Sequence, residues 1–141
     1  MSKTFYGQLR PISDRWIPEV LAVSGFTREQ TLASPEPEPV MRQFARWLAG
    51  QCGARAMFIS DNNEFDRQFI NLCFHHFIGS NPFGFSSTNL GSLYKGVVRD
   101  TTQNFKHLRK SSHTHYPVDD AKGNSEALLA IKDTFDLKIR L

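Results

Sequence analysis

A short apolar run between two stretches of helical spacing is the feature that most constrains how this chain can fold. The run Ala56–Ser60 has the length and composition of a buried central strand. Apolar residues with the spacing of one helical face precede it, namely Val40, Met41, Phe44, Trp47 and Leu48. A similar stripe follows, in a helix that starts near Glu64, and consists of Phe65, Phe69, Leu72, Cys73 and His76. Helix, strand and helix, with further helices downstream, predict an α/β fold in a single domain of residues 1–141.

The composition is that of an ordinary folded protein. Of the 141 residues, 40% are hydrophobic and 22% are charged, as in soluble globular domains. No run approaches the ~18 apolar residues of a membrane span, and the first residues lack the apolar stretch of a signal peptide. We therefore expect a cytoplasmic protein with no membrane partner. Cys52 and Cys73 form no Cys-x-x-Cys pair, so neither a disulfide nor a zinc site is expected.

Positive charge is concentrated between Asn89 and His115, where Asp100 is the sole acid. The net charge of the whole chain is only +3, so the distribution is more informative than the total. Such a segment suits the phosphate backbone of a nucleic acid, although a solvated surface loop has the same composition. From this segment we expect Lys106, Arg109 and Lys110 to contact nucleic acid.

The last predicted helix, over residues 119–133, begins with a carboxylate on its apolar side. Asp120, Asn124, Ala127, Leu128 and Ile131 share one helical face. A carboxylate there is costly unless it is paired, hydrogen-bonded or bound to a metal, and the helix dipole favours its charged form. Asp120 is therefore a candidate metal ligand. The alternative is that it only caps the helix.

Asp66 repeats this arrangement in the helix that starts near Glu64. It lies at the edge of the apolar stripe, in the first turn, four residues after Asn62. Taken alone it is equally explained as a helix-cap acid. Two helices that open in this way predict that Asp66 and Asp120 converge on a divalent cation with a preference for oxygen, magnesium or manganese.

His115 precedes Asp120 by five residues and is the candidate general base. An ordinary imidazole titrates near neutrality and can therefore accept a proton from an attacking water. His113, two residues earlier, competes for this role, and either histidine could instead be a surface residue of the basic segment.

Together these residues resemble two motifs of the DEDDh exonucleases, the superfamily of RNase T, oligoribonuclease and the proofreading subunit of DNA polymerase III. The matched residues are Asn62, Phe65 and Asp66 in one motif and His115, Asp120 and Ala121 in the other. Residues 9–27 are also similar to the family's segment after its third strand. The resemblance covers nearly the whole chain in the right order.

The resemblance implies an RNase H-like fold and 3′–5′ removal of nucleoside monophosphates from single-stranded DNA or RNA ends. It implies two magnesium or manganese ions, with Asp66 and Asp120 as metal ligands and His115 as the base. Asn62 is expected to lie at the nucleic acid. Phe83 or Phe85 could stack on a base, although core packing is the other explanation for either.

The family's first motif, Asp-x-Glu, has no counterpart in this sequence. Two-metal hydrolysis needs carboxylates that bridge the ions, so the expected activity is impaired. If the weakly alternating stretch from Thr4 to Arg10 is the third strand, the first strands of the central sheet are missing and the fold is N-terminally incomplete. The uncovered edges and faces predict a marginally stable or aggregating chain.

Two other functions fit the same residues. One is a catalytically inactive, truncated nuclease-fold domain with residual nucleic-acid binding. The other is a small interaction domain in which the acids and the histidine are incidental. The sequence leaves open DNA against RNA and the oligomeric state, and a dimer is compatible with it.

Overall fold

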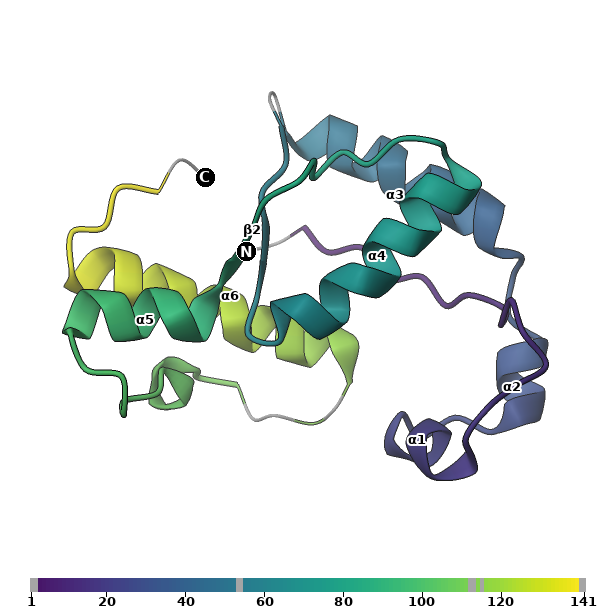
Figure 1. The fold of residues 1–141 in the computed structure, drawn as a ribbon, viewed down its shortest axis with the longest axis horizontal. Helices are drawn as coiled ribbons and strands as arrows, with labels where there is room; N and C mark the ends of the chain where they lie inside the picture. The colour runs from purple at the N-terminus through teal and green to yellow at the C-terminus, as the bar shows by residue number, and fades with distance from the viewer. Residues whose placement is uncertain (1–2, 53–54, 112–113, 115, 140–141) are drawn as a thin grey trace. The chain divides into compact units, whose positions relative to one another are not determined.

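The computed structural model describes residues 3–52, 55–111, 114 and 116–139 (Figure 1). The chain divides into two compact units, each considered separately below. The first comprises Met57–Asp66 and the chain from Ser86 onwards, and the second comprises Lys3–Ala56 and Arg67–Phe85. No helix in the described ranges is long and apolar enough to cross a membrane.

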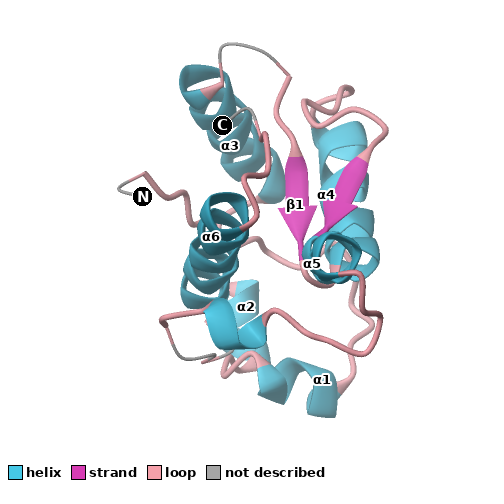
Figure 2. Ribbon diagram, turned by 90° about the vertical axis from the view of Figure 1, so that its left-hand side faces the viewer, coloured by secondary structure: helices cyan, strands magenta, loops and turns pink. Residues whose placement is uncertain are grey.

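The first unit contains a parallel pair of strands, β1 (Phe58–Ser60) and β2 (Ser87–Asn89). The two strands lie side by side and run in the same direction (Figure 2). Phe58 pairs with Ser87 and Ser60 with Asn89. The predicted strand at residues 56–60 therefore forms, over its last three residues. Parallel strands need a long crossover, which here contains α4 (Asn63–Phe77) and the loop after it.

Three helical segments complete the first unit: α5 (Leu90–Val98), the 3-10 turn η1 (Lys106–Leu108) and α6 (Pro117–Thr134). Helices α5 and α6 lie side by side (Figure 1). Their contact forms the buried core of the unit, which consists of Leu90, Tyr94, Phe105, Ala127, Leu128 and Ile131. The predicted apolar face of the last helix is thus confirmed as the packed face.

The second unit contains α1 (Pro18–Val23), α2 (Arg28–Leu32), α3 (Pro37–Gln51) and the part of α4 from Arg67. Its core is an aromatic cluster around Phe44, whose ring centroid lies 5.0 Å from that of Phe5 and 5.5 Å from that of Phe74. The apolar stripe predicted for α3 is confirmed, since its most buried members are Val40, Met41 and Leu48.

The prediction for α4 was wrong, because the apolar stripe that it named is not the packed face of the helix. Phe65, Phe69 and Leu72 are 54%, 50% and 49% exposed, whereas Phe74 is fully buried. The helix also carries Ile70, Phe74 and Phe77 at helical spacing, so it has two apolar stripes. Periodicity cannot indicate which of two such faces packs, and the second one does so here.

The strand expected from Thr4 to Arg10 is also wrong, because residues 3–10 form no strand. The backbone of Arg10 donates to the carbonyl of Pro35 at 2.8 Å, in a loop contact instead of a ladder. A weakly alternating segment becomes a strand only beside another strand, and the second unit contains none among its described residues.

Replacing Phe74 with alanine should lower the free energy of unfolding by about 3–5 kcal/mol, because it leaves a cavity within the aromatic cluster. The control is Phe85→Ala at a 97% exposed position, which should change it by less than about 0.5 kcal/mol. Urea unfolding followed by circular dichroism measures both. Equal losses in the two variants would contradict the described core.

Candidate catalytic and metal-binding site

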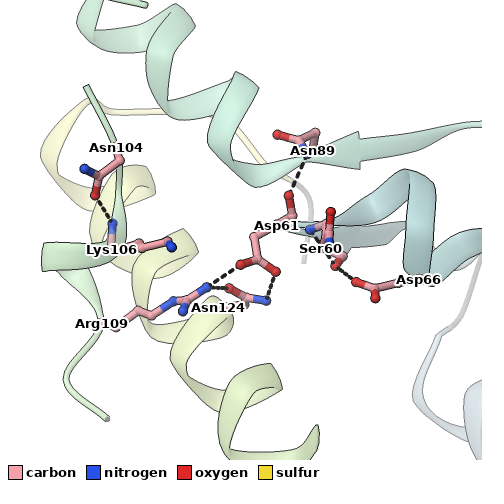
Figure 3. Close-up of polar contacts among 9 residues, drawn as sticks. Ser60, Asp61, Asp66, Asn89, Asn104, Lys106, Arg109 and Asn124 are labelled. Atoms are coloured by element: carbon pink, nitrogen blue, oxygen red, sulfur yellow. Dashed lines mark hydrogen bonds and ion pairs between the residues drawn. The ribbon is translucent and has the colours of Figure 1, made fainter. Parts of the chain in front are cut away.

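Asp66 lies in the first turn of α4, at the carboxyl end of β1. Its Oδ2 accepts a hydrogen bond from the hydroxyl of Ser60, the buried last residue of β1 (Figure 3). The backbone N–H of Asp66 donates to the carbonyl of Asn62 at 3.0 Å. The carboxylate is thus half-buried and held beside the strand end, while the side chain of Asn62 is exposed.

Asp120 lies in the first turn of α6 and is half-buried. The N-cap residue of this helix is Tyr116, and no side-chain capping bond is formed there. The neighbouring Asp119 accepts a hydrogen bond from the hydroxyl of Thr114 at 3.0 Å. Asp120 is therefore not the capping residue, which removes that alternative explanation of its position.

The predicted base, His115, and its competitor His113 lie outside the described residues. Of the proposed catalytic set, the structure therefore describes the two aspartates, which both belong to the first unit. Within the described part of the chain, no group of three or more His, Cys, Asp or Glu side chains is placed to hold a metal ion.

A partly buried ion pair lies between the strand end and α6 (Figure 3). The guanidinium of Arg109 donates to Asp61 Oδ2 at 2.8 Å and to Asn124 Oδ1 at 2.6 Å. Asn124 Nδ2 in turn donates to Asp61 Oδ1 at 3.3 Å, which closes a triangle. The Arg109 side chain is only 7% exposed. The structure thus places Arg109, one of the residues predicted to contact nucleic acid, in an internal contact.

The other two predicted cations, Lys106 and Lys110, are exposed. Their described hydrogen bonds are made by the backbone: the N–H of Lys106 donates to Asn104 Oδ1 at 3.1 Å, and that of Lys110 to Glu126 Oε2 at 2.8 Å. The charge of Lys110 also acts weakly on Glu126. These two ammonium groups therefore remain suited to a phosphate backbone.

Asp61 is kept charged by its partners. Burial alone would raise the pKa of its carboxyl, but hydrogen bonds from Arg109 and Asn124, together with the charge of Arg109, outweigh that effect. The pKa of Asp61 is therefore lowered from its ordinary value of 3.8. The ion pair persists at neutral pH.

Gly123 lets Arg109 approach α6 closely. A Cβ atom at Gly123 would lie 3.3 Å from Cδ and 3.5 Å from Cγ of Arg109, so the arginine stem crosses the helix there. The guanidinium carbon lies 5.1 Å from the ring centroid of Phe105. Glycine inside a helix costs about 0.5–1 kcal/mol relative to alanine, and the close packing of Arg109 explains its presence here.

Glu126 of α6 accepts hydrogen bonds from the chain segment just before His113 and His115. Its carboxylate accepts from the backbone N–H of Lys110 at 2.8 Å and from the N–H and hydroxyl of Ser111, each at 2.9 Å. The backbone N–H of Ser111, then that of Lys110, lowers the pKa of Glu126 from its ordinary value. Lys110 and Ser111 are thus fixed to α6.

Two asparagines that the sequence analysis missed join β2 to the turn after β1. Asn89 Nδ2 donates to the carbonyl of Asp61 at 2.8 Å and to Asn63 Oδ1 at 3.1 Å. Asn63 Nδ2 donates to the Ser87 hydroxyl at 2.8 Å. Their only sequence signal was position, since each lies within three residues of the carboxyl end of a strand.

The loop before β2 presents an aromatic ring in the second unit. Phe83 is buried, whereas Phe85 is 97% exposed. Arg55 donates to the carbonyl of Phe83 at 3.0 and 3.1 Å, and Arg67 donates to that of Gly84 at 2.6 Å. Gly84 has φ of 63°, and a Cβ there would collide with Arg55. The two arginines therefore hold the loop in a shape that leaves Phe85 exposed.

The chain is similar in sequence to a known nuclease. No protein-family model matches the chain. Over 99 residues it is 35% identical to 3′-5′ DNA exonuclease Cap18 of Escherichia coli. The chain is similar to a 3′–5′ DNA exonuclease. The aligned region covers 68% of this chain and 53% of that relative, so the chain spans about half the length of the protein it matches.

The donor set partly fits the cation expected from the resemblance. Carboxylate oxygens are suitable ligands for magnesium or manganese, and magnesium commonly needs only one or two of them because it retains waters. Asp66 and Asp120 are carboxylates of this kind, one in the first turn of α4 and one in the first turn of α6. Among the described residues, the additional carboxylate cluster that a pair of ions would require is not found.

The lowered pKa of Asp61 predicts a specific loss of stability in acid. A carboxyl with a depressed folded pKa stabilises the fold above its unfolded value of 3.8, and this contribution is lost as the pH falls through the folded pKa. The melting temperature of the wild type should therefore exceed that of Asp61→Asn by a constant amount between about pH 7 and 5 and converge with it below about pH 4. If the difference in melting temperature between the wild type and Asp61→Asn persisted at low pH, Asp61 would not be part of an ion pair.

Proposed function

We propose that this chain is a DEDDh-type exonuclease domain with an RNase H-like fold, which removes nucleotides from 3′ ends of DNA. The similarity to a 3′-5′ DNA exonuclease carries this proposal. The positions of Asp66 and Asp120, each half-buried in the first turn of a helix in the first unit, support it. The name of the relative favours DNA over RNA as the substrate.

In this proposal Asp66 and Asp120 hold a magnesium or manganese ion, and His115 takes the proton from the attacking water. Such an ion, when bound, would neutralise charge on the phosphodiester and favour ionisation of water. The hydroxyl of Ser60 orients the Asp66 carboxylate through their hydrogen bond. Because no Asp-x-Glu pair is present, the two-ion form of the reaction lacks its bridging ligands and the activity is low.

The exposed side chains supply the contacts to DNA. Lys106 and Lys110 attract the phosphate backbone, and Asn62 lies in the turn between β1 and α4. Phe85 provides a flat apolar surface on which a base of single-stranded DNA stacks. Arg109 is not included among these contacts, because its guanidinium is engaged by Asp61 and Asn124.

A second candidate is a catalytically inactive domain that only binds nucleic acid. It is favoured by the missing third carboxylate among the described residues. It predicts salt-dependent binding to single-stranded DNA without turnover.

Single-turnover degradation of end-labelled single-stranded DNA with Mn²⁺ separates the two candidates. Asp66→Ala, Asp120→Ala and His115→Ala should each slow cleavage by at least about 100-fold, since a metal or base contribution of several kcal/mol corresponds to two or more orders of magnitude. The control is Asp133→Ala, which removes an exposed acid of α6, the helix that carries Asp120. This variant should retain the wild-type rate.

If the wild type cleaves and the Asp120 variant is as active as the Asp133 variant, the proposed site is wrong. If the wild type binds DNA in a salt-sensitive manner but does not cleave it, the inactive binding domain is the correct function.

Phe85→Ala should weaken binding of single-stranded DNA by about 1–3 kcal/mol, the usual contribution of one stacked base. Phe85→Trp keeps a π face and should retain affinity, whereas Phe85→Leu keeps apolar bulk only and should behave like the alanine variant. Fluorescence anisotropy with a short labelled oligonucleotide gives the dissociation constants. Wild-type affinity in both the leucine and alanine variants would exclude a stacking role.

A further inference from the structure

One buried arginine joins the three segments around the candidate site. Arg109 belongs to the segment between η1 and α6, Asp61 to the turn after β1, and Asn124 to α6. The contacts among them measure 2.8, 2.6 and 3.3 Å. All three residues belong to the first unit, so the triangle lies within one compact body.

Two members of this triangle, Asp61 and Asn124, are each connected to a candidate metal ligand. On the strand side, Asp61 follows Ser60 directly, and the Ser60 hydroxyl donates to the Asp66 carboxylate. On the helix side, Asn124 lies four residues after Asp120. Positions four apart on a helix lie on the same face, about 6 Å apart along the axis. Short and rigid connections therefore lead from Arg109 to Asp66 and to Asp120.

The energetics of the contact point to a geometric role beyond its contribution to stability. A buried charge is costly, and a buried ion pair often stabilises a fold no more than apolar residues of similar volume would. Arg109 Nε is in addition buried without a hydrogen-bond partner in the described part of the chain. An arginine with two partners in fixed directions does, however, specify geometry, because its donors form a rigid planar fork.

We infer that Arg109 is a positioning residue, which ties Asp61 to Asn124 and thereby fixes the separation of the Asp66 and Asp120 carboxylates. This inference rests on the proposed function, because it requires that the two aspartates hold a divalent cation. It does not require Arg109 to touch the cation or the DNA. Loss of Arg109 should therefore weaken cation binding while both ligands remain present.

Binding of Mn²⁺ to the purified full chain, followed by the electron paramagnetic resonance of free Mn²⁺, tests the inference without an activity assay. Arg109→Met keeps the apolar stem and removes both contacts. It should weaken Mn²⁺ binding by about tenfold, the lower end of the range for residues that orient metal ligands. Asp120→Ala should abolish binding. Leu128→Ala is the control, because it truncates a buried core residue of the same unit and helix without touching the triangle.

Three results would overturn the inference. The first is wild-type Mn²⁺ affinity in Arg109→Met together with no Mn²⁺ binding in Asp120→Ala. That result would overturn the role of Arg109 and leave the proposed metal site intact. The second is an equal loss in Leu128→Ala, which would show a general effect of destabilisation. The third is a wild type that binds no Mn²⁺, which would overturn the proposed metal site as well.

If Arg109→Met does not fold, Asn124→Ala takes its place. That variant keeps the ion pair between Arg109 and Asp61 but releases α6 from it. It should fold and bind Mn²⁺ several-fold more weakly than the wild type, and unchanged affinity would overturn the inference.

Discussion

The first unit depends on one buried charge, the guanidinium of Arg109. Its side chain is 7% exposed, so its charge has to be satisfied inside the protein. Asp61 supplies the opposite charge and Asn124 a further acceptor. Gly123 provides the space for the arginine stem. One side chain of the segment before α6 therefore contacts both the turn at the strand end and α6.

Local patterns in the sequence predicted the helices well. The apolar faces of α3 and α6 follow from spacing alone, since each helix has one apolar side and buries it. The face of α4 could not be predicted in this way, because Phe69 and Phe74 belong to two different apolar stripes of the same helix. Only tertiary packing decides between such stripes.

The candidate acids were also visible locally, because a carboxylate in the first turn of an amphipathic helix is readable from spacing. The partners of Arg109, which are Asp61 and Asn124, could not be seen in the sequence pattern. A basic residue in a basic segment favours a surface role, and its partners lie 48 and 15 residues away. A glycine in the middle of α6 was the one local indication that something packs closely there. The similarity to a DNA exonuclease supports the activity at a coarse level, and the ion stoichiometry stays a prediction.

The parallel pairing of β1 with β2 has a consequence for how the protein folds. Partners such as Phe58 and Ser87 are separated by the whole of α4 and its following loop, and Asn124 lies 63 residues from Asp61. Contacts of such long sequence separation incur a large loop-closure entropy, so they form after the local helices. We therefore expect the strand pairing and the contact between Asp61 and Asn124 to form late in folding and to open early in partial unfolding.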